Sequence, residues 1–395
     1  DEAFNIFTSY PPFNAESPSD RVTLSNQAYE AARDFYLLGE TDKAGSLFAT
    51  SRDFETGSGA EMSSAALLSL VDNNFGEAAY HYQRGARRYQ QDIFYAGYLR
   101  LLHVSGHHEE AWAVFDNLPA GKKTSMVWDS ALYGLRIEGK SDREISLWYQ
   151  KKKTDGDATD FFLSQLIDRK QGAKLPFRLQ NDRGKKNFID IYRDVKIDNY
   201  RKDHPYSKVS KGEFINHNFL PYLAIYFHET GRHDRFTVLL EEFCSKRGKG
   251  FEQHLAEGVL KGLNSQPEDA LKEFHQAWLQ VPFRRNNYLP ALYQLSDLCE
   301  WLFEKTKDHR YLKAGLEYAR LKNQQDPTAA WPYAFLAKHA ESASERLRAL
   351  GTVLYLDPNS ERIRFFPEKE KEQAKRFFEK SNPFTSAPKE EQAEA

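Results

Sequence analysis

The chain has 395 residues, with 55 Lys and Arg against 57 Asp and Glu, so its formal net charge is only −2. This balance excludes the strong overall basicity of a typical nucleic-acid-binding protein. The mean hydropathy is −0.71, and no stretch approaches the roughly 20 apolar residues that a membrane-spanning helix needs. The sequence therefore predicts no membrane span in this chain and no nucleic-acid partner.

Residues 1–24 are expected to form an extended N-terminal arm. Pro11, Pro12 and Pro18 interrupt any helix there. The chain starts Asp1-Glu2 without an initiator Met, which fits either a processed secretory protein or a trimmed chain. We therefore expect a periplasmic or secreted location more than a cytoplasmic one.

From residue 25 a pattern of a turn residue, a small residue and an aromatic residue recurs. Gly39 is followed five residues later by Ala44 and four residues after that by Phe48. The same series repeats as Asn73, Ala78 and Tyr82, as Gly106, Ala111 and Phe115, and, without the small residue, as Gly139, Glu144 and Trp148. The middle position thus falls at 44, 78, 111 and 144, in steps of 34, 33 and 33.

This spacing has a direct physical interpretation as a pair of antiparallel helices. Gly or Asn adopts the left-handed conformation that ends the first helix. The small residue lets the second helix approach the first closely. The aromatic residue, one helical turn further on, lies on the same face and fills the groove.

These repeated markers, with a closing proline, resemble the tetratricopeptide repeat, a helix–turn–helix unit of about 34 residues. The best single unit contains Gly258, Ala270, Phe274, Ala277 and Pro282. Several units lack the early Trp and the Leu-Gly pair of the family, so the repeats are divergent. The resemblance implies an all-α fold, a right-handed superhelical solenoid of antiparallel helix pairs.

The repeats predict five regions along the chain. After the arm, N-terminal repeats occupy 25–150 and C-terminal repeats occupy 216–364, with an irregular basic connector or degenerate repeats at 151–215. Residues 365–395 are expected to contain a capping helix from Glu368 to Lys380 and a disordered tail. The markers at 270 and 314 are 44 residues apart, which predicts a lengthened turn near Lys307.

Some residues match motifs that carry chemistry. Residues 134–141, GLRIEGKS, satisfy the phosphate-loop expression, but the repeat register makes 128–138 a helix that Gly139 ends and 142–151 the next helix. His228 and His233, and likewise His103, His107 and His108, flank helix-ending turns. Cys244 and Cys299 have no metal spacing, and a bridge or two buried thiols both stay open. We expect no metal and no cofactor.

The repeat resemblance also implies which residues line an inner, concave face. Three arginines beside tyrosines on that face would suit a segment that carries carboxylate or phosphate groups, since Arg offers a planar fork and Tyr offers stacking. The residues implied are Tyr29, Arg33, Tyr36, Arg100, His103, Tyr133, Arg136 and His228.

The function that these features favour is a non-catalytic scaffold or adaptor for protein–protein interaction. Its partner would be another protein or a peptide segment, with acidic segments among the candidates, in a multi-protein assembly of a bacterial cell envelope or export system. An alternative is a carbohydrate-binding or polysaccharide-handling solenoid, because aromatic residues make up 14% of the chain and the middle segment is basic. A nucleotide-binding enzyme that uses Lys140 is a more remote alternative.

Overall fold

A computed structural model of the chain describes residues 17–152, 250–283 and 291–384, with short helical pieces at 221, 224–225, 237 and 240–241. Within these residues the chain forms helices joined by short turns, and no strand occurs among them. The expected connector lies outside the described residues beyond residue 152, as do His228, Cys244 and the tail from residue 385.

The chain divides into two compact units. The first contains Asp1–Ala158 and Ala319–Ala395, and the second contains Thr159–Tyr318. The expected C-terminal repeats at 216–364 thus extend over parts of both units. The division falls inside the long helix α19 (His309–Gln325).

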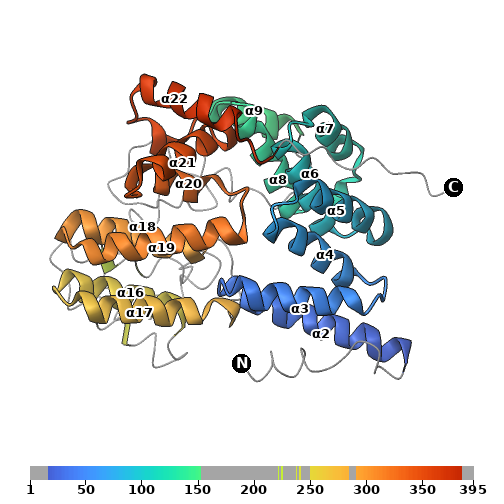
Figure 1. Ribbon diagram of the computed structural model, residues 1–395, viewed down its shortest axis with the longest axis horizontal. Coiled ribbons are helices and arrows are strands. Elements are labelled where there is room, and N and C mark those ends of the chain that lie inside the picture. The colour runs from blue at the N-terminus through green and yellow to red at the C-terminus, as the bar shows by residue number, and fades with distance from the viewer. Residues whose placement is uncertain are drawn as a thin grey trace, which may run out of the picture. The chain divides into compact units, whose positions relative to one another are not determined.

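The N-terminal part of the first unit is a series of helices that pack on their neighbours in sequence (Figure 1). Each hairpin, such as α2 with α3 or α4 with α5, buries its facing sides. The helices are α2 (Pro18–Leu37), α3 (Thr41–Asp53), α4 (Gly59–Val71), α5 (Phe75–Tyr89), α6 (Asp92–Val104), α7 (His108–Asn117), η2 (Ala120–Lys122), α8 (Ser125–Ile137) and α9 (Asp142–Lys152).

The repeated turn residues adopt the conformation that the sequence predicts. Gly39, Asn73, Gly106 and Gly139 have φ values of 74°, 54°, 83° and 73°, and each lies between two helices. A left-handed residue reverses the chain after the first helix of a pair, and glycine and asparagine tolerate it best. The small residues that follow, Ala44, Ala78 and Ala111, are fully buried, so the helices of these pairs do approach closely.

The expected arm is too long, because α2 already begins at Pro18. Ser17 caps this helix, its side-chain oxygen accepting a hydrogen bond from the backbone N–H of Asp20 at 3.1 Å. A proline at the first helical position costs nothing there, since its missing N–H would have no partner within the helix. Pro18 therefore starts the helix that it was expected to interrupt.

The C-terminal part of the first unit contains the end of α19, α20 (Ala330–His339), α21 (Ala343–Leu356), η6 (Glu361–Ile363) and α22 (Glu368–Glu379). Helix α22 begins at the residue predicted for the capping helix. Helix α21 packs against α8, and the two lie close together in Figure 1. The C-terminal helices thus contact N-terminal repeats that lie about 200 residues earlier in the chain.

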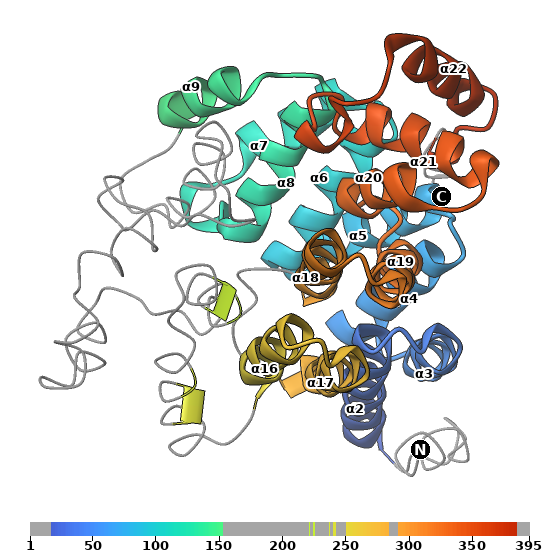
Figure 2. The same cartoon turned by 90° about the vertical axis from the view of Figure 1, so that its left-hand side faces the viewer.

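The second unit contains α16 (Phe251–Leu263), α17 (Pro267–Leu279), η5 (Val281–Phe283), α18 (Ala291–Thr306) and α19 as far as Tyr318. Helices α16 and α17 run side by side in Figure 1 and are seen nearly end-on in Figure 2. A Cβ atom at Gly258 would lie 2.5 Å from the Phe274 ring, so glycine allows this close packing. Cys299 is a buried free thiol, and burial raises its pKa.

The lengthened turn expected near Lys307 does not occur. Only Lys307 and Asp308 separate α18 from α19, and Lys307 has a φ of 61°. The two helices have 16 and 17 residues, whereas α16 and α17 have 13 each. Longer helices therefore contribute to the 44-residue step. None of the described helices is long and apolar enough to cross a membrane.

Candidate functional site

Arg100 is at the centre of a group of polar contacts in the first unit. Its Nη2 atom lies 3.4 Å from Oδ2 of Asp326, and its guanidinium carbon lies 4.5 Å from the centre of the Tyr133 ring. The side chains of Arg100 and Asp326 are 33% and 25% exposed, so both charges are largely withdrawn from water. The guanidinium thus combines an ion pair with a cation–π contact. Both are interactions that arginine makes with carboxylates and with tyrosine rings.

Asp326 belongs to the short connection between α19 and α20. Its side chain makes hydrogen bonds within this connection. Its Oδ1 accepts hydrogen bonds from the backbone N–H and the hydroxyl of Thr328, at 3.2 and 2.6 Å, and Lys322 Nζ lies 3.2 Å from Oδ2. Burial alone would raise the pKa of Asp326, but Arg100 and Lys322 outweigh it and hold that pKa well below its usual range. Asp326 is therefore a carboxylate that stays charged.

Two tyrosines of the expected inner face make contacts with this connection or with the last residue of α19. The hydroxyl of Tyr133 donates a hydrogen bond to the carbonyl of Thr328. Gln325 Nε2 donates to the carbonyls of Tyr36 and Leu37 at 2.7 and 3.1 Å. Burial raises the pKa of Tyr133 and of Tyr36. Both phenols are therefore neutral and able to donate.

A second set of contacts joins the end of α21 to the ends of α6 and α8. Arg136 Nη1 lies 3.5 Å from Oδ2 of Asp357, and the Tyr355 hydroxyl donates to the carbonyl of Val104 at 2.6 Å. Asn359 donates to the carbonyl of Gly139 at 2.9 Å. The carbonyl of Val104, the last residue of α6, lacks a partner within its helix, and Tyr355 supplies one; Asn359 supplies a partner for the carbonyl of the turn residue Gly139. We call all these contacts the polar seam; its members are Tyr36, Arg100, Val104, Tyr133, Arg136 and Gly139 on one side and Gln325, Asp326, Thr328, Tyr355, Asp357 and Asn359 on the other.

The other residues expected on the inner face lie elsewhere. Tyr29 packs its ring 6.0 Å from that of Phe48, and Arg33, which is 48% exposed, pairs with Glu30 on its own helix. His228 lies outside the described residues. The structure thus brings four of the expected residues together, and their partners Asp326 and Asp357 are ones that sequence reasoning missed.

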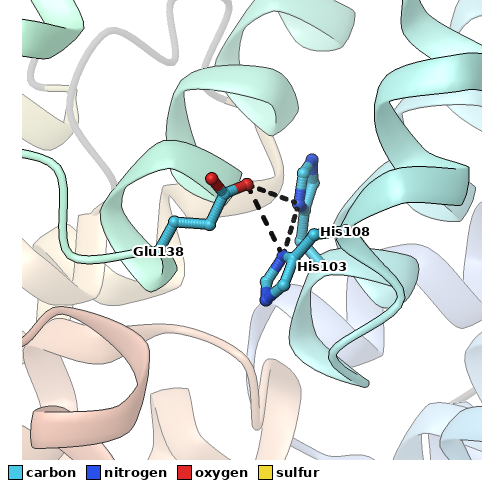
Figure 3. A group of neighbouring side chains, drawn as sticks. All are labelled: His103, His108 and Glu138. Carbon is cyan, nitrogen blue, oxygen red and sulfur yellow. Dashed lines mark hydrogen bonds and ion pairs between the residues drawn. The ribbon is translucent and has the colours of Figure 1, made fainter.

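His103 is fully buried and does not line an open groove. Figure 3 shows its ring beside that of His108, with Glu138 facing both. The Nδ1 atoms of the two histidines are 3.1 Å apart, and Oε1 of Glu138 lies 4.0 Å from His103 Nδ1 and 3.7 Å from His108 Nδ1. Burial, followed by the neighbouring His108, lowers the pKa of His103 to about 3, so His103 is a neutral imidazole.

Residues 134–141 do not form a phosphate loop in their local structure. Gly134 lies within α8, where a Cβ atom would be 2.3 Å from His103 Nε2, and Gly139 ends the helix as predicted. The start of α9 is closed by Glu144, whose carboxylate accepts hydrogen bonds from the N–H and the hydroxyl of Ser141. The backbone N–H of Glu144 donates in return to the Ser141 hydroxyl at 3.3 Å, which completes a capping box and uses donors that a phosphate would need.

A scan of protein-family models finds no match to this sequence, and a search of curated proteins finds none either. The tetratricopeptide character of the repeats therefore stays a resemblance, carried by the turn, small and aromatic markers. One sequence signal for the histidine pair is visible in retrospect. His103 and His108 stand three residues before and two residues after Gly106, and His228 and His233 stand in the same way around Gly231.

Proposed function

We propose that this chain is a non-catalytic scaffold that holds another protein against its helical repeats, and that the repeats wind into a right-handed superhelix. Support comes from the sequential packing of its helix pairs and from the turn residues that define each repeat. Stacked repeats create extended surfaces that suit partner binding. A place in a cell-envelope or export assembly belongs to the same proposal.

The observation that carries the proposal is the contact of Arg100 with Asp326 and Tyr133. Here an arginine supported by a tyrosine ring holds a carboxylate of a short, irregular segment of the same chain. Arg136 holds a second carboxylate, that of Asp357. We propose that the partner is an acidic peptide segment that makes the same kind of contact on this face.

Such a partner would compete with the chain's own carboxylates. Its apparent affinity is then reduced by the fraction of molecules in which the inner face is free of Asp326 and Asp357. The proposal therefore requires the polar seam to open at least locally. The Arg100–Asp326 pair retains some exposure, 33% and 25%, so it can exchange with water more readily than the Arg136–Asp357 pair, which is 13% and 12% exposed.

A charge reversal tests whether Arg100 binds a partner or only supports the fold. The partner is first identified by cross-linking in the native cell, and its capture is then compared for wild type, Arg100→Asp, and the double variant Arg100→Asp with Asp326→Arg. The double variant can re-form the internal ion pair with its polarity reversed. We expect its thermal stability to recover relative to Arg100→Asp, while capture of the acidic partner stays lost.

Two outcomes would contradict this site. If the single variant captures the partner as well as wild type does, Arg100 takes no part in binding. If the double variant regains both stability and capture, the pair serves the fold alone. Arg33→Asp is a matched control, because Arg33 is also an arginine of the expected inner face but pairs with Glu30 on its own helix, away from the polar seam.

The carbohydrate-binding alternative is less well supported at Tyr133. Arg100 covers one face of this ring, and the hydroxyl is engaged by the Thr328 carbonyl. A sugar that stacks on an aromatic side chain needs an open ring face. A glycan array that is positive for wild type and negative for Tyr133→Ala would favour this alternative over the acidic-peptide proposal.

A further inference from the structure

The histidine pair is built from the ends of three helices. His103 is near the end of α6, His108 is the first residue of α7, and Glu138 follows the last residue of α8. Two histidines five residues apart on one continuous helix would point in different directions. Gly106, with its φ of 83°, reverses the chain between them, and the two Nδ1 atoms face each other at 3.1 Å (Figure 3).

The three donor atoms have the spacing of metal ligands. Tetrahedral zinc binds imidazole nitrogen and carboxylate oxygen at about 2.0–2.2 Å, which sets neighbouring ligand atoms roughly 3.3–3.5 Å apart. The distances here are 3.1, 3.7 and 4.0 Å. Shifts of a few tenths of an ångström at each side chain would bring all three onto one ion.

Hydrogen bonds account for part of this arrangement. Two neutral imidazoles that face each other through Nδ1 can share one proton, which satisfies the 3.1 Å contact. The Glu138 oxygen then faces both nitrogens at 3.7 and 4.0 Å, beyond hydrogen-bonding distance of either. A cation between the three atoms would bind a lone pair of each, because Oε1 of Glu138 has a second lone pair besides the one that accepts from Trp112.

The surroundings hold the donors in place. Trp112 Nε1 donates a hydrogen bond to the same Glu138 oxygen at 2.7 Å, and the Trp112 ring lies 4.5 Å from the His103 ring. Close packing on Gly134 fixes His103 from the other side. A hydrogen bond such as the one from Trp112 to Glu138 orients a metal ligand and tunes its affinity.

The site is open to solvent on one side. His103 is fully buried, but the side chains of His108 and Glu138 are 31% and 22% exposed. An ion could therefore enter without unfolding, and a water molecule could complete a four-coordinate shell. Two imidazoles and one carboxylate favour zinc and its neighbours in the first transition row over magnesium or calcium.

We propose that His103 Nδ1, His108 Nδ1 and Glu138 Oε1 form a binding site for a divalent transition-metal ion of the zinc class. The ion would tie the α6–α7 turn to the end of α8 and so fasten two successive repeats. The site is distinct from the proposed partner surface. The sequence alone predicts that these histidines bind no metal, so the proposal differs from that prediction.

The test uses the full chain, free of any affinity tag and treated with a chelator that is then removed. Titration calorimetry with zinc chloride measures ions bound per chain for wild type, His108→Gln and Glu138→Gln. We expect each variant to lose one ion per chain relative to wild type, or to bind it at least about tenfold more weakly. Visible absorption of the cobalt(II) form gives an independent readout of tetrahedral coordination at the site.

Two further variants make the result specific. His107→Gln removes the histidine next to His108 that is not part of the cluster, and it should bind as wild type does. The double variant His228→Gln with His233→Gln removes the second sequence pattern of this spacing, and the ion lost in His108→Gln should survive in it.

The proposal is overturned if wild type binds no zinc, if His107→Gln loses as much as His108→Gln, or if the ion disappears only with the His228 and His233 variant. Circular dichroism checks that each variant is folded. If His108→Gln fails to fold, Glu138→Gln decides the outcome by itself, because its amide oxygen can still accept from Trp112.

Discussion

Arg100 and Asp326 form an ion pair although 226 residues separate them in the chain. The contact joins α6, in the third repeat, to the connection that precedes α20. It sits beside the Tyr133 ring and is surrounded by the other contacts of the polar seam. Substitutions at this pair therefore test two things. They test the proposed partner surface, and they test how much the contact between the C-terminal helices and the N-terminal repeats contributes to stability.

Asp326→Asn should lower the free energy of unfolding by roughly 1–3 kcal/mol, because it leaves a partly buried guanidinium without its carboxylate. Urea denaturation with a single transition would measure this. Glu30→Gln is the matched control, since Glu30 pairs with Arg33 on a surface where both side chains are about half exposed. Exposed pairs contribute less than about 1 kcal/mol. Equal effects of the two substitutions would show that the Arg100–Asp326 pair contributes no more to the free energy of unfolding than an exposed ion pair does.

The same pair makes a prediction about pH. The pKa of Asp326 is held below its ordinary value of 3.8, so folding is favoured by the charged form. The stability that it contributes is fully present above the unfolded pKa and is lost as the pH falls through the lower folded pKa. The difference in unfolding free energy between wild type and Asp326→Asn should be constant near neutrality and shrink only below about pH 4. A difference that already shrinks between pH 7 and 5 would contradict this assignment.

Two glycines with the same turn geometry should respond differently to alanine. Gly39 and Gly106 both have positive φ, so alanine costs roughly 1–2 kcal/mol of backbone strain at each. At Gly39 the new Cβ would also lie 1.9 Å from the Leu321 side chain, whereas nothing lies within 4 Å at Gly106. Gly39→Ala should be less stable than Gly106→Ala by roughly 1–3 kcal/mol in thermal or chemical unfolding. Equal losses would show that the Leu321 contact is not maintained in solution.

Gly134→Ala should disturb His103. Alanine favours a helix interior over glycine by about 1 kcal/mol, but the added Cβ would lie 2.3 Å from the buried imidazole. Displacing that ring should cost roughly 1–3 kcal/mol, so we expect a net loss of stability together with weaker zinc binding. Gly121→Ala, where nothing lies within 4 Å, should change neither. Unchanged zinc affinity in Gly134→Ala would argue against His103 as a ligand.

Much of the local structure of the described repeats is predictable from the sequence. The residues Gly39, Asn73, Gly106 and Gly139 end helices because few other residues tolerate positive φ, and the markers five and nine residues later follow from helical geometry. The same reasoning locates α8 and α9 around the phosphate-loop expression. It fails at Pro18, where a residue that breaks helix interiors instead begins a helix, because the outcome depends on position within the turn.

The candidate sites are predictable only in part. The sequence by itself determined the helix pairs and the register of their turns, since these depend on neighbours within one or two repeats. The repeat resemblance added the prediction that Arg100, Tyr133 and Arg136 share one face. Only the tertiary structure decided that Asp326 and Asp357 face these arginines and that Glu138 meets His103 and His108. Such contacts depend on how whole helices pack in three dimensions. A local pattern of residues does not encode which side chain from a distant part of the chain will contact a given residue.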